Sequence, residues 1–214
     1  MTPNLNPEPP RDCPLCPRLV EYRHENARQN PGWFNGPAPS FGDPQGRLLI
    51  VGLAPGRTGA NRTGRPFTGD HAGVLLYETL KTTGFAQGDY QARPDDTLRL
   101  VDCMVTNAVR CAPPGNKPWP IEEATCRPFL TARLAALPRL KVIVTLGDVS
   151  RRNVLKALGL PGSAAPPGHG VEVMVAGYVL LNSYHCSRLN TNTGRLTSAM
   201  FEAVFLRARE LLMG

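Results

Sequence analysis

Continuous apolar runs alternate with amphipathic segments along this chain. The runs predict strands over residues 47–53, 99–108 and 141–146, because a strand buried on both faces of a parallel sheet needs apolar residues at most positions. Residues 171–181 predict a further strand or a hairpin. Helical spacing of the apolar residues predicts helices over 15–28, 71–83, 121–137, 148–158 and 196–212.

This alternation predicts an α/β fold, in which helices cover both faces of a sheet. A chain of 214 residues with 42% hydrophobic content is long enough for one well-packed domain and too short for two large ones. Residues 1–12 are rich in proline and polar side chains, so we expect a flexible tail there, followed by a single domain over 13–214.

Hydropathy and charge narrow the classes of partner. The longest apolar run, Val173 to Leu181, is much shorter than the ~20 residues that a membrane-spanning helix needs. No apolar signal segment begins the sequence, so we expect a cytoplasmic protein. The net charge of +7 suits a polyanionic partner such as DNA or RNA, although many basic proteins bind neither.

Four of the six cysteines form two pairs, Cys13 with Cys16 and Cys111 with Cys126. Because no secretory signal precedes them, a metal or cluster site is favoured over disulfides. Four thiolates can hold a zinc ion or an iron–sulfur cluster, and the spacing alone does not choose between them. Cys103 lies inside a predicted strand and fits an ordinary buried thiol.

Two polar loops follow predicted strands, at the place where open α/β sheets bind ligands. The first, GLAPGRTGANRTGRPFTGD, is neither a Walker loop nor a GxGxxG motif. Its glycines leave backbone N–H groups free, and Arg62 and Arg65 can meet phosphates. Asp70 lies at the end of this loop, and its role can be limited to that of N-cap of the next helix.

The second loop, SYHCSRLNTNTGRLT, follows the apolar stretch that ends at residue 181. His185 can be a hydrogen-bonded structural residue, as a lone histidine often is. Ser187, Arg188 and Arg195 follow it in the same loop, and their hydroxyl and guanidinium groups suit phosphate oxygens. The alternative is a polar loop that only caps the last helix.

The segments GLAPG, NRTGRPFTGD, VTNAVRC and YHCSRLNTNTGRLT resemble the motifs of uracil-DNA glycosylases. They resemble in particular family 5, the type B enzymes that carry a four-iron, four-sulfur cluster, from Cys13 to about Thr197. This resemblance implies a three-layer α/β/α sandwich around a four-stranded, mainly parallel sheet. It also implies a 4Fe–4S cluster held by Cys13, Cys16, Cys111 and Cys126.

The resemblance also implies roles for individual residues. Better-known families carry a polar catalytic residue in the first motif, where this chain has apolar Leu53 or Ala54. As in family 5, Asp70 at the end of FTGD is then the expected catalytic acid, and His185 matches the histidine of the second motif. Asn107 matches the residue that hydrogen-bonds the base. The base is expected to meet Gly52, Leu53, Ala54 and the ring of Phe67.

The activity implied is removal of uracil from double-stranded DNA by a monomeric repair enzyme, with hypoxanthine or xanthine as further substrates. The base must be flipped out of the duplex, and Arg188 and Leu189 are candidates to fill the gap. Cys186 stands where many relatives have proline. The expected DNA contacts are Arg62, Arg65, Ser187, Arg188, Leu189 and Arg195.

Two other readings stay open at this point. The chain can be a non-catalytic DNA-binding module with an iron–sulfur cluster, in which Asp70 is merely a helix cap. It can also be a uracil-DNA-binding relative that couples covalently to the abasic site.

Overall fold

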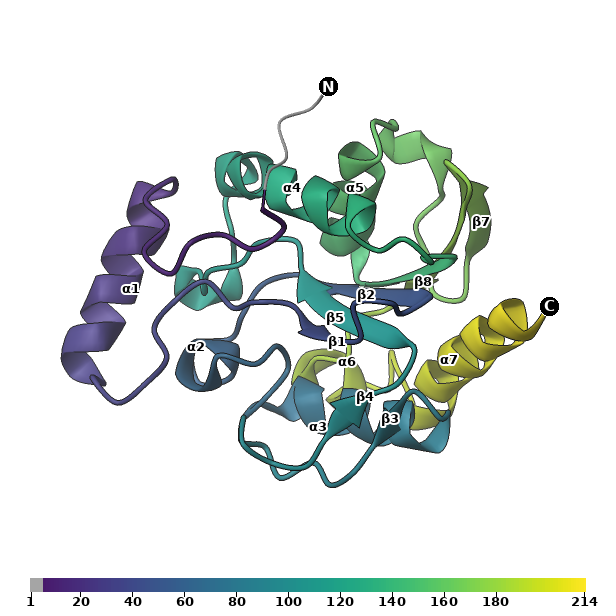
Figure 1. Ribbon diagram of the computed structural model, residues 1–214, viewed down its shortest axis with the longest axis horizontal. Helices are drawn as coiled ribbons and strands as arrows, with labels where there is room; N and C mark the ends of the chain where they lie inside the picture. The colour runs from purple at the N-terminus through teal and green to yellow at the C-terminus, as the bar shows by residue number, and fades with distance from the viewer. Residues whose placement is uncertain (1–5) are drawn as a thin grey trace.

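A six-stranded sheet forms the centre of the computed structural model, which describes residues 6–214 (Figure 1). The strand order is β1-β5-β2-β6-β8-β7; the four central strands are parallel, and each edge strand is antiparallel to its neighbour. The strands are β1 (Phe41–Gly42), β2 (Leu48–Gly52), β5 (Cys103–Asn107), β6 (Val142–Leu146), β7 (Glu172–Val175) and β8 (Tyr178–Ser183). The expected α/β/α sandwich with four parallel strands is confirmed, and a short antiparallel strand extends it at each edge.

Helices cover both faces of this sheet, with α4 and α5 on one side and α3 and α7 on the other (Figure 1). In β2, Leu48 and Ile50 join the core under α3 and α7, whereas Leu49 and Val51 join the core under α4 and α5. Strands packed on both faces explain the unbroken apolar runs of the sequence. The helices are α1 (Pro17–Gln29), α2 (Ala60–Thr63), α3 (His71–Thr82), α4 (Pro120–Ala135), α5 (Asp148–Ala157), α6 (Arg188–Asn192) and α7 (Ser198–Met213), with short 3₁₀ turns η1 (Pro114–Asn116) and η2 (Gly162–Ala164).

The strand predicted over 99–108 is divided in the structure. Its first residues form β4 (Arg99–Leu100), which pairs with β3 (Ala86–Gln87) in a separate two-stranded sheet. Asp102 breaks the run with a positive φ of 56° and accepts hydrogen bonds from Arg47. The apolar stretch near 171–181 forms the hairpin β7–β8. Its turn at Ala176 and Gly177 has positive φ at both positions, as tight hairpins favour.

The N-terminal segment differs from the expected tail over 1–12. From residue 6 onward it packs on the domain: Glu8 accepts a hydrogen bond from the backbone of Ser40 and pairs with Arg110 and Arg133. Arg110 is 1% exposed, so Glu8 supplies the counter-charge of a buried cation. Residues 1–5 of the expected tail lie outside the described residues.

None of the helices in residues 6–214 has the length and apolar character needed to cross a membrane.

Candidate active site

The two polar loops meet at the carboxyl edge of the parallel strands. Gly52, the last residue of β2, lies opposite Asn107, the last residue of β5. A cavity of about 480 Å³ opens beyond this edge. Most of the expected site residues line it: Leu53, Ala54, Phe67, Asp70, Asn107, His185, Ser187 and Arg188.

Asn107 and Phe67 form the floor of this cavity against Gly52. A Cβ atom on Gly52 would lie 2.5 Å from Oδ1 of Asn107 and 2.5 Å from Cζ of Phe67, so only glycine fits there. Oδ1 of Asn107 is buried and has no hydrogen-bond partner within residues 6–214. A buried unpaired acceptor costs about 1–3 kcal/mol, which a ligand N–H would recover.

Asp70 begins α3 and lies at the cavity wall. Its Oδ1 accepts a 3.0 Å hydrogen bond from the backbone N–H of Gly73, so the expected capping role is present. Its Oδ2 faces Gly56 and Gly59, and a side chain on Gly59 would collide with it. Burial raises the pKa of Asp70, and the backbone hydrogen bonds offset only part of this effect. One carboxylate oxygen thus caps the helix while the other faces the glycine loop.

His185 also lines this cavity, just beyond the end of β8. Its ring stacks near Phe67, with 6.2 Å between ring centroids and 30° between planes. Burial lowers the pKa of His185 to about 4, so the imidazole is neutral at pH 7. A neutral imidazole in this place can donate a hydrogen bond without carrying charge.

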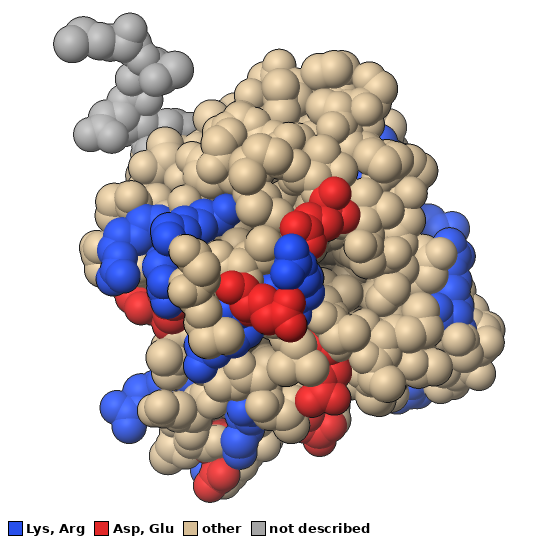
Figure 2. Space-filling model, turned by 90° about the vertical axis from the view of Figure 1, so that its right-hand side faces the viewer, with Lys and Arg blue, Asp and Glu red and all other residues tan. Residues whose placement is uncertain are grey.

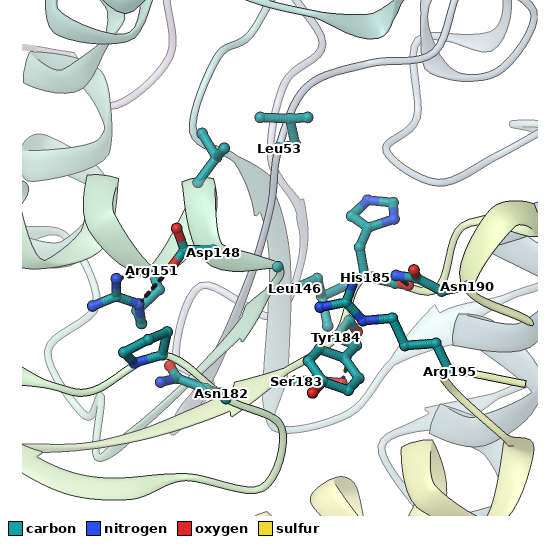
Figure 3. A pocket seen from close by; sticks show the side chains of 14 residues that line it. Leu53, Leu146, Asp148, Arg151, Asn182, Ser183, Tyr184, His185, Asn190 and Arg195 are labelled. Atoms are coloured by element: carbon teal, nitrogen blue, oxygen red, sulfur yellow. Dashed lines mark hydrogen bonds and ion pairs between the residues drawn. The ribbon is translucent and has the colours of Figure 1, made fainter. Parts of the chain in front are cut away.

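A second cavity of about 490 Å³ adjoins the first and shares Leu53 and His185 with it (Figure 3). The guanidinium of Arg195 lies over the Tyr184 ring, 4.5 Å from its centroid, on the same side as His185. Asp148, across the cavity, pairs with Arg151 and Arg152. The two cavities together form a groove along the carboxyl edge of the sheet.

Three predicted DNA contacts are placed outside the cavity lining. Arg62 is exposed on α2, and Leu189 on α6 is 73% exposed. The prediction for Arg65 is wrong, because its side chain is 6% exposed and forms a bidentate ion pair with Asp96. Arg65 therefore stabilises the loop before Asp70 and is not available to a phosphate.

Arg57, His71 and Asn116 are among the cavity residues that were not predicted from the sequence. Arg57 stands inside the glycine loop and His71 directly follows Asp70, so their positions carried a signal. Nε2 of His71 lies 3.1 Å from Oγ1 of Thr191, a contact that joins the two loops. Asn116 comes from the segment between Cys111 and Cys126, where nothing in the pattern indicated a pocket.

Acidic and basic side chains alternate on the face formed by α7 and β7 (Figure 2). Arg207 on α7 pairs there with Glu172 of β7 and with Glu210. This face is therefore not a continuous basic surface.

The four paired cysteines line one small cavity of about 20 Å³, between the start of α1 and α4. Their sulfurs have donors nearby: the Arg110 N–H lies 3.3 Å from Cys126 Sγ, and Nη1 of Arg23 lies 3.9 Å from Cys111 Sγ. Burial raises the pKa of Cys126 to about 11 and that of Cys111 to about 12. Within residues 6–214, no three His, Cys, Asp or Glu side chains meet as ligands of a single ion.

This donor set fits a thiolate-bound group. All four cysteines line the same cavity, and N–H groups near the sulfurs can stabilise the negative charge that thiolates carry when bound. Cys103 is buried in the main core under Phe85, as expected for a structural thiol.

Comparison with known proteins identifies the family. The model of the uracil DNA glycosylase superfamily matches residues 39–209. The chain is 46% identical over 206 residues to the type-5 uracil-DNA glycosylase of Thermus thermophilus, covering 93% of each chain. It is 40% identical to the type-5 uracil-DNA glycosylase of Pyrobaculum aerophilum, covering 92% of this chain and 88% of that relative.

A type-4 uracil-DNA glycosylase of Pyrobaculum aerophilum is 32% identical over 70% of this chain. The type-5 matches are higher in identity and span nearly the whole sequence. The protein thus belongs to the type-5 uracil-DNA glycosylases of the uracil DNA glycosylase superfamily.

Proposed function

We propose that this DNA-repair glycosylase excises uracil in the cavity at the carboxyl edge of the sheet, with Asp70 and His185 acting at opposite ends of the breaking bond. The observation that carries the proposal is that one cavity gathers Asp70, Asn107, Phe67 and His185 from three separate segments. The base stacks on Phe67, and the amide of Asn107 pairs with the N–H and C=O on its edge.

Excision of uracil hydrolyses the N-glycosidic bond between C1′ of the sugar and N1 of the base. The bonding electrons leave with the base, and a water molecule adds to C1′ and releases a proton. Asp70 stabilises the cationic sugar or orients that water through its free oxygen, and neutral His185 donates a hydrogen bond to the anionic base. Preorganised groups of this kind typically contribute about 10²–10³ each in rate.

Hypoxanthine and xanthine are further substrates in this proposal. Like uracil, each presents a ring N–H beside a carbonyl oxygen, and an amide can pair with that edge through one acceptor and one donor. The apolar walls at Leu53 and Ala54 carry no group that would select a pyrimidine ring. Stacking on Phe67 is likewise tolerant of base identity.

Duplex DNA runs along the groove that the two cavities form. Arg62, Ser187 and Arg195 contact phosphates, which position the strand without reading its sequence. Exposed Arg188 and Leu189, at the start of α6, fill the space that the flipped base leaves. We propose that the enzyme acts on chromosomal DNA in the cytosol as a monomer.

The four cysteines Cys13, Cys16, Cys111 and Cys126 hold a 4Fe–4S cluster in this proposal, with zinc as the alternative. Support comes from the shared cavity, because in a four-iron cluster each thiolate binds its own iron and the sulfurs surround a space. Through these cysteines, a bound cluster would connect the start of α1 to α4. Its formation requires the loss of protons from thiols whose pKa burial has raised.

Single-turnover excision from a uracil-containing duplex tests the assignment of Asp70. Asp70→Asn keeps a capping side chain, so the variant should fold and bind DNA normally, while its excision rate falls roughly 10²–10³-fold. Asp89→Asn, at an exposed carboxylate, is the matched control and should keep the wild-type rate. An Asp70→Asn enzyme that excises uracil at the wild-type rate would leave Asp70 only its capping role.

A further inference from the structure

A second histidine lies behind the turn that carries His185. His169 stands in the loop before β7, between Gly168 and Gly170, which both have positive φ. This loop is fixed to β8, since the N–H of Gly170 donates to the carbonyl of Asn182 over 2.8 Å. His169 is partly buried and does not line either cavity.

Both ring nitrogens of His169 have a partner of fixed polarity. The backbone N–H of Tyr184 can only donate, and it lies 3.2 Å from Nδ1. The carbonyl of Met200 can only accept, and it lies 3.2 Å from Nε2. Nδ1 is therefore bare and Nε2 carries the proton. Burial also lowers the pKa of His169, which favours this neutral form.

Nδ1 of His169 accepts a hydrogen bond from the backbone of Tyr184, the residue directly before His185, and so fixes the backbone there. Ser183 anchors the same turn on the strand side, where its carbonyl accepts from the N–H of Gly147 over 2.8 Å. Beyond it, the side chain of Asn190 donates to the carbonyl of His185 over 2.8 Å. The backbone around His185 is thus held by three partners from separate segments, and His169 is the only one of the three that bonds the N–H side of the turn.

We propose that His169 is a positioning residue, which sets the His185 imidazole against the departing base through its hydrogen bond from the Tyr184 N–H. This inference rests on the proposed role of His185. The Tyr184 ring also contacts the His169 ring, with 5.3 Å between ring centroids, and the guanidinium of Arg195 lies over the same Tyr184 ring. His169 therefore contacts both the backbone next to His185 and the ring that supports Arg195, the cation expected at the DNA backbone.

Two substitutions separate the contacts at the two ring nitrogens. Nδ1 accepts from the Tyr184 N–H and also lies 3.4 Å from the Ser183 hydroxyl, which can donate to it, whereas Nε2 contacts only the Met200 carbonyl among the described residues. In His169→Asn the side-chain oxygen can replace Nδ1 as the acceptor for Tyr184, while the contact with Met200 is lost. In His169→Gln the terminal amide can replace Nε2 as the donor to Met200, while the acceptor for Tyr184 is lost. His24→Gln, at an exposed position on α1, controls for the loss of a histidine as such.

Single-turnover excision at saturating enzyme and the Kd for uracil-containing duplex are measured for each variant. We expect His169→Gln to slow excision roughly tenfold to a hundredfold, since a displacement of about 1 Å at a catalytic group has an effect of this size. His169→Asn should keep most of the wild-type rate, and the melting temperatures of the two variants should be similar. A slow Asn variant beside a fast Gln variant would show that the tie to α7 matters instead, and would overturn the proposal.

The same substitutions in a His185→Ala background separate this inference from the role of His185. If His169 acts through His185, then His169→Gln has no further effect on the rate once His185 is removed. A persisting effect refutes the positioning role, whereas a wild-type rate in His185→Ala alone refutes the role of His185. In the wild-type protein, ¹⁵N chemical shifts of labelled histidine should show Nδ1 of His169 unprotonated at neutral pH; a proton on Nδ1 would contradict the proposal without any variant.

Discussion

Asp70 combines two demands that oppose each other. As a helix N-cap it stabilises α3 through its hydrogen bond from Gly73, but its burial disfavours the ionised form that the proposed catalytic role needs. The absence of a side chain on Gly59 leaves room for the free oxygen at the cavity wall. An acid kept charged in such a place reduces the stability of the folded protein, and the sign of this effect can be measured.

Asp70→Asn should therefore melt at a higher temperature than the wild type at pH 7. Because the folded-state pKa of Asp70 is raised, the stability that its protonated form contributes is present in acid and is lost as the pH rises through that pKa. The difference in melting temperature should shrink as the pH is lowered toward the ordinary pKa of an aspartate. Thermal melts at several pH values check this, with Asp89→Asn as the control; a difference that grows toward low pH would contradict the raised pKa.

At the scale of elements, the loop between α2 and α3 carries Phe67 in a left-handed conformation with φ of 52°. The hydroxyl of Tyr90 donates to the Phe67 carbonyl over 3.1 Å, and Arg65 pairs with Asp96, whose side chain is fully buried. Burial by itself would raise the pKa of Asp96, but hydrogen bonds from Arg65 and from backbone N–H groups outweigh it and lower the pKa to about 2. The long connection between β3 and β4 thus fixes the loop that carries Phe67.

Asp96→Asn should destabilise the protein by about 3–5 kcal/mol, because it leaves the Arg65 guanidinium buried without a counter-charge. Lys81→Ala breaks the exposed pair with Asp89 and should cost less than about 1 kcal/mol. Urea unfolding of the three proteins measures the difference. In the wild type, the contribution of Asp96 is present above the ordinary aspartate pKa and is lost as the pH falls toward about 2. Equal decreases in the free energy of unfolding in the two variants would mean that the buried pair contributes no more stability than the exposed one.

The sequence was informative wherever one short segment determines its own environment. The apolar runs predicted β2 and β6 and the alternation of strands and helices, because these strands are buried on both faces. It failed where the partner is distant: nothing near Arg65 indicates that Asp96, 31 residues away, would bind it. The division of the predicted strand at Asp102 and the docking of Glu8 have the same origin, since each depends on an arginine far along the chain.

At the scale of the whole molecule, the cysteine cavity joins the first helix to the centre of the chain. Cys111 follows β5 by only a few residues, so the same segment carries Asn107 of the base pocket and a ligand of the proposed cluster. The stability of the N-terminal region and the geometry of the pocket should therefore depend on one group.

Purified protein should contain about four iron and four sulfide per chain and absorb near ~400 nm, as thiolate-bound clusters do. Cys111→Ser should lose the iron and melt at a lower temperature, because cluster binding is coupled to folding. Cys103→Ser, at a buried thiol outside the cavity, should keep the full iron content. Iron and zinc analysis together with thermal melts distinguishes a 4Fe–4S cluster from a zinc ion at these cysteines. One zinc per chain without iron would favour zinc.

The docked segment around Glu8 has a consequence for where this protein can be cut. The carboxylate of Glu8 and the carbonyl of Pro7 bind the guanidinium of Arg110, which is almost inaccessible to solvent and lies next to Cys111. Proteolytic trimming or a shortened gene product that began after residue 8 would leave this guanidinium without the carboxylate that pairs with it. The polar, proline-rich N-terminal segment resembles dispensable sequence, yet its Pro7 and Glu8 bind a buried cation of the domain. An N-terminal truncation that removes them should therefore lower the stability of the folded protein.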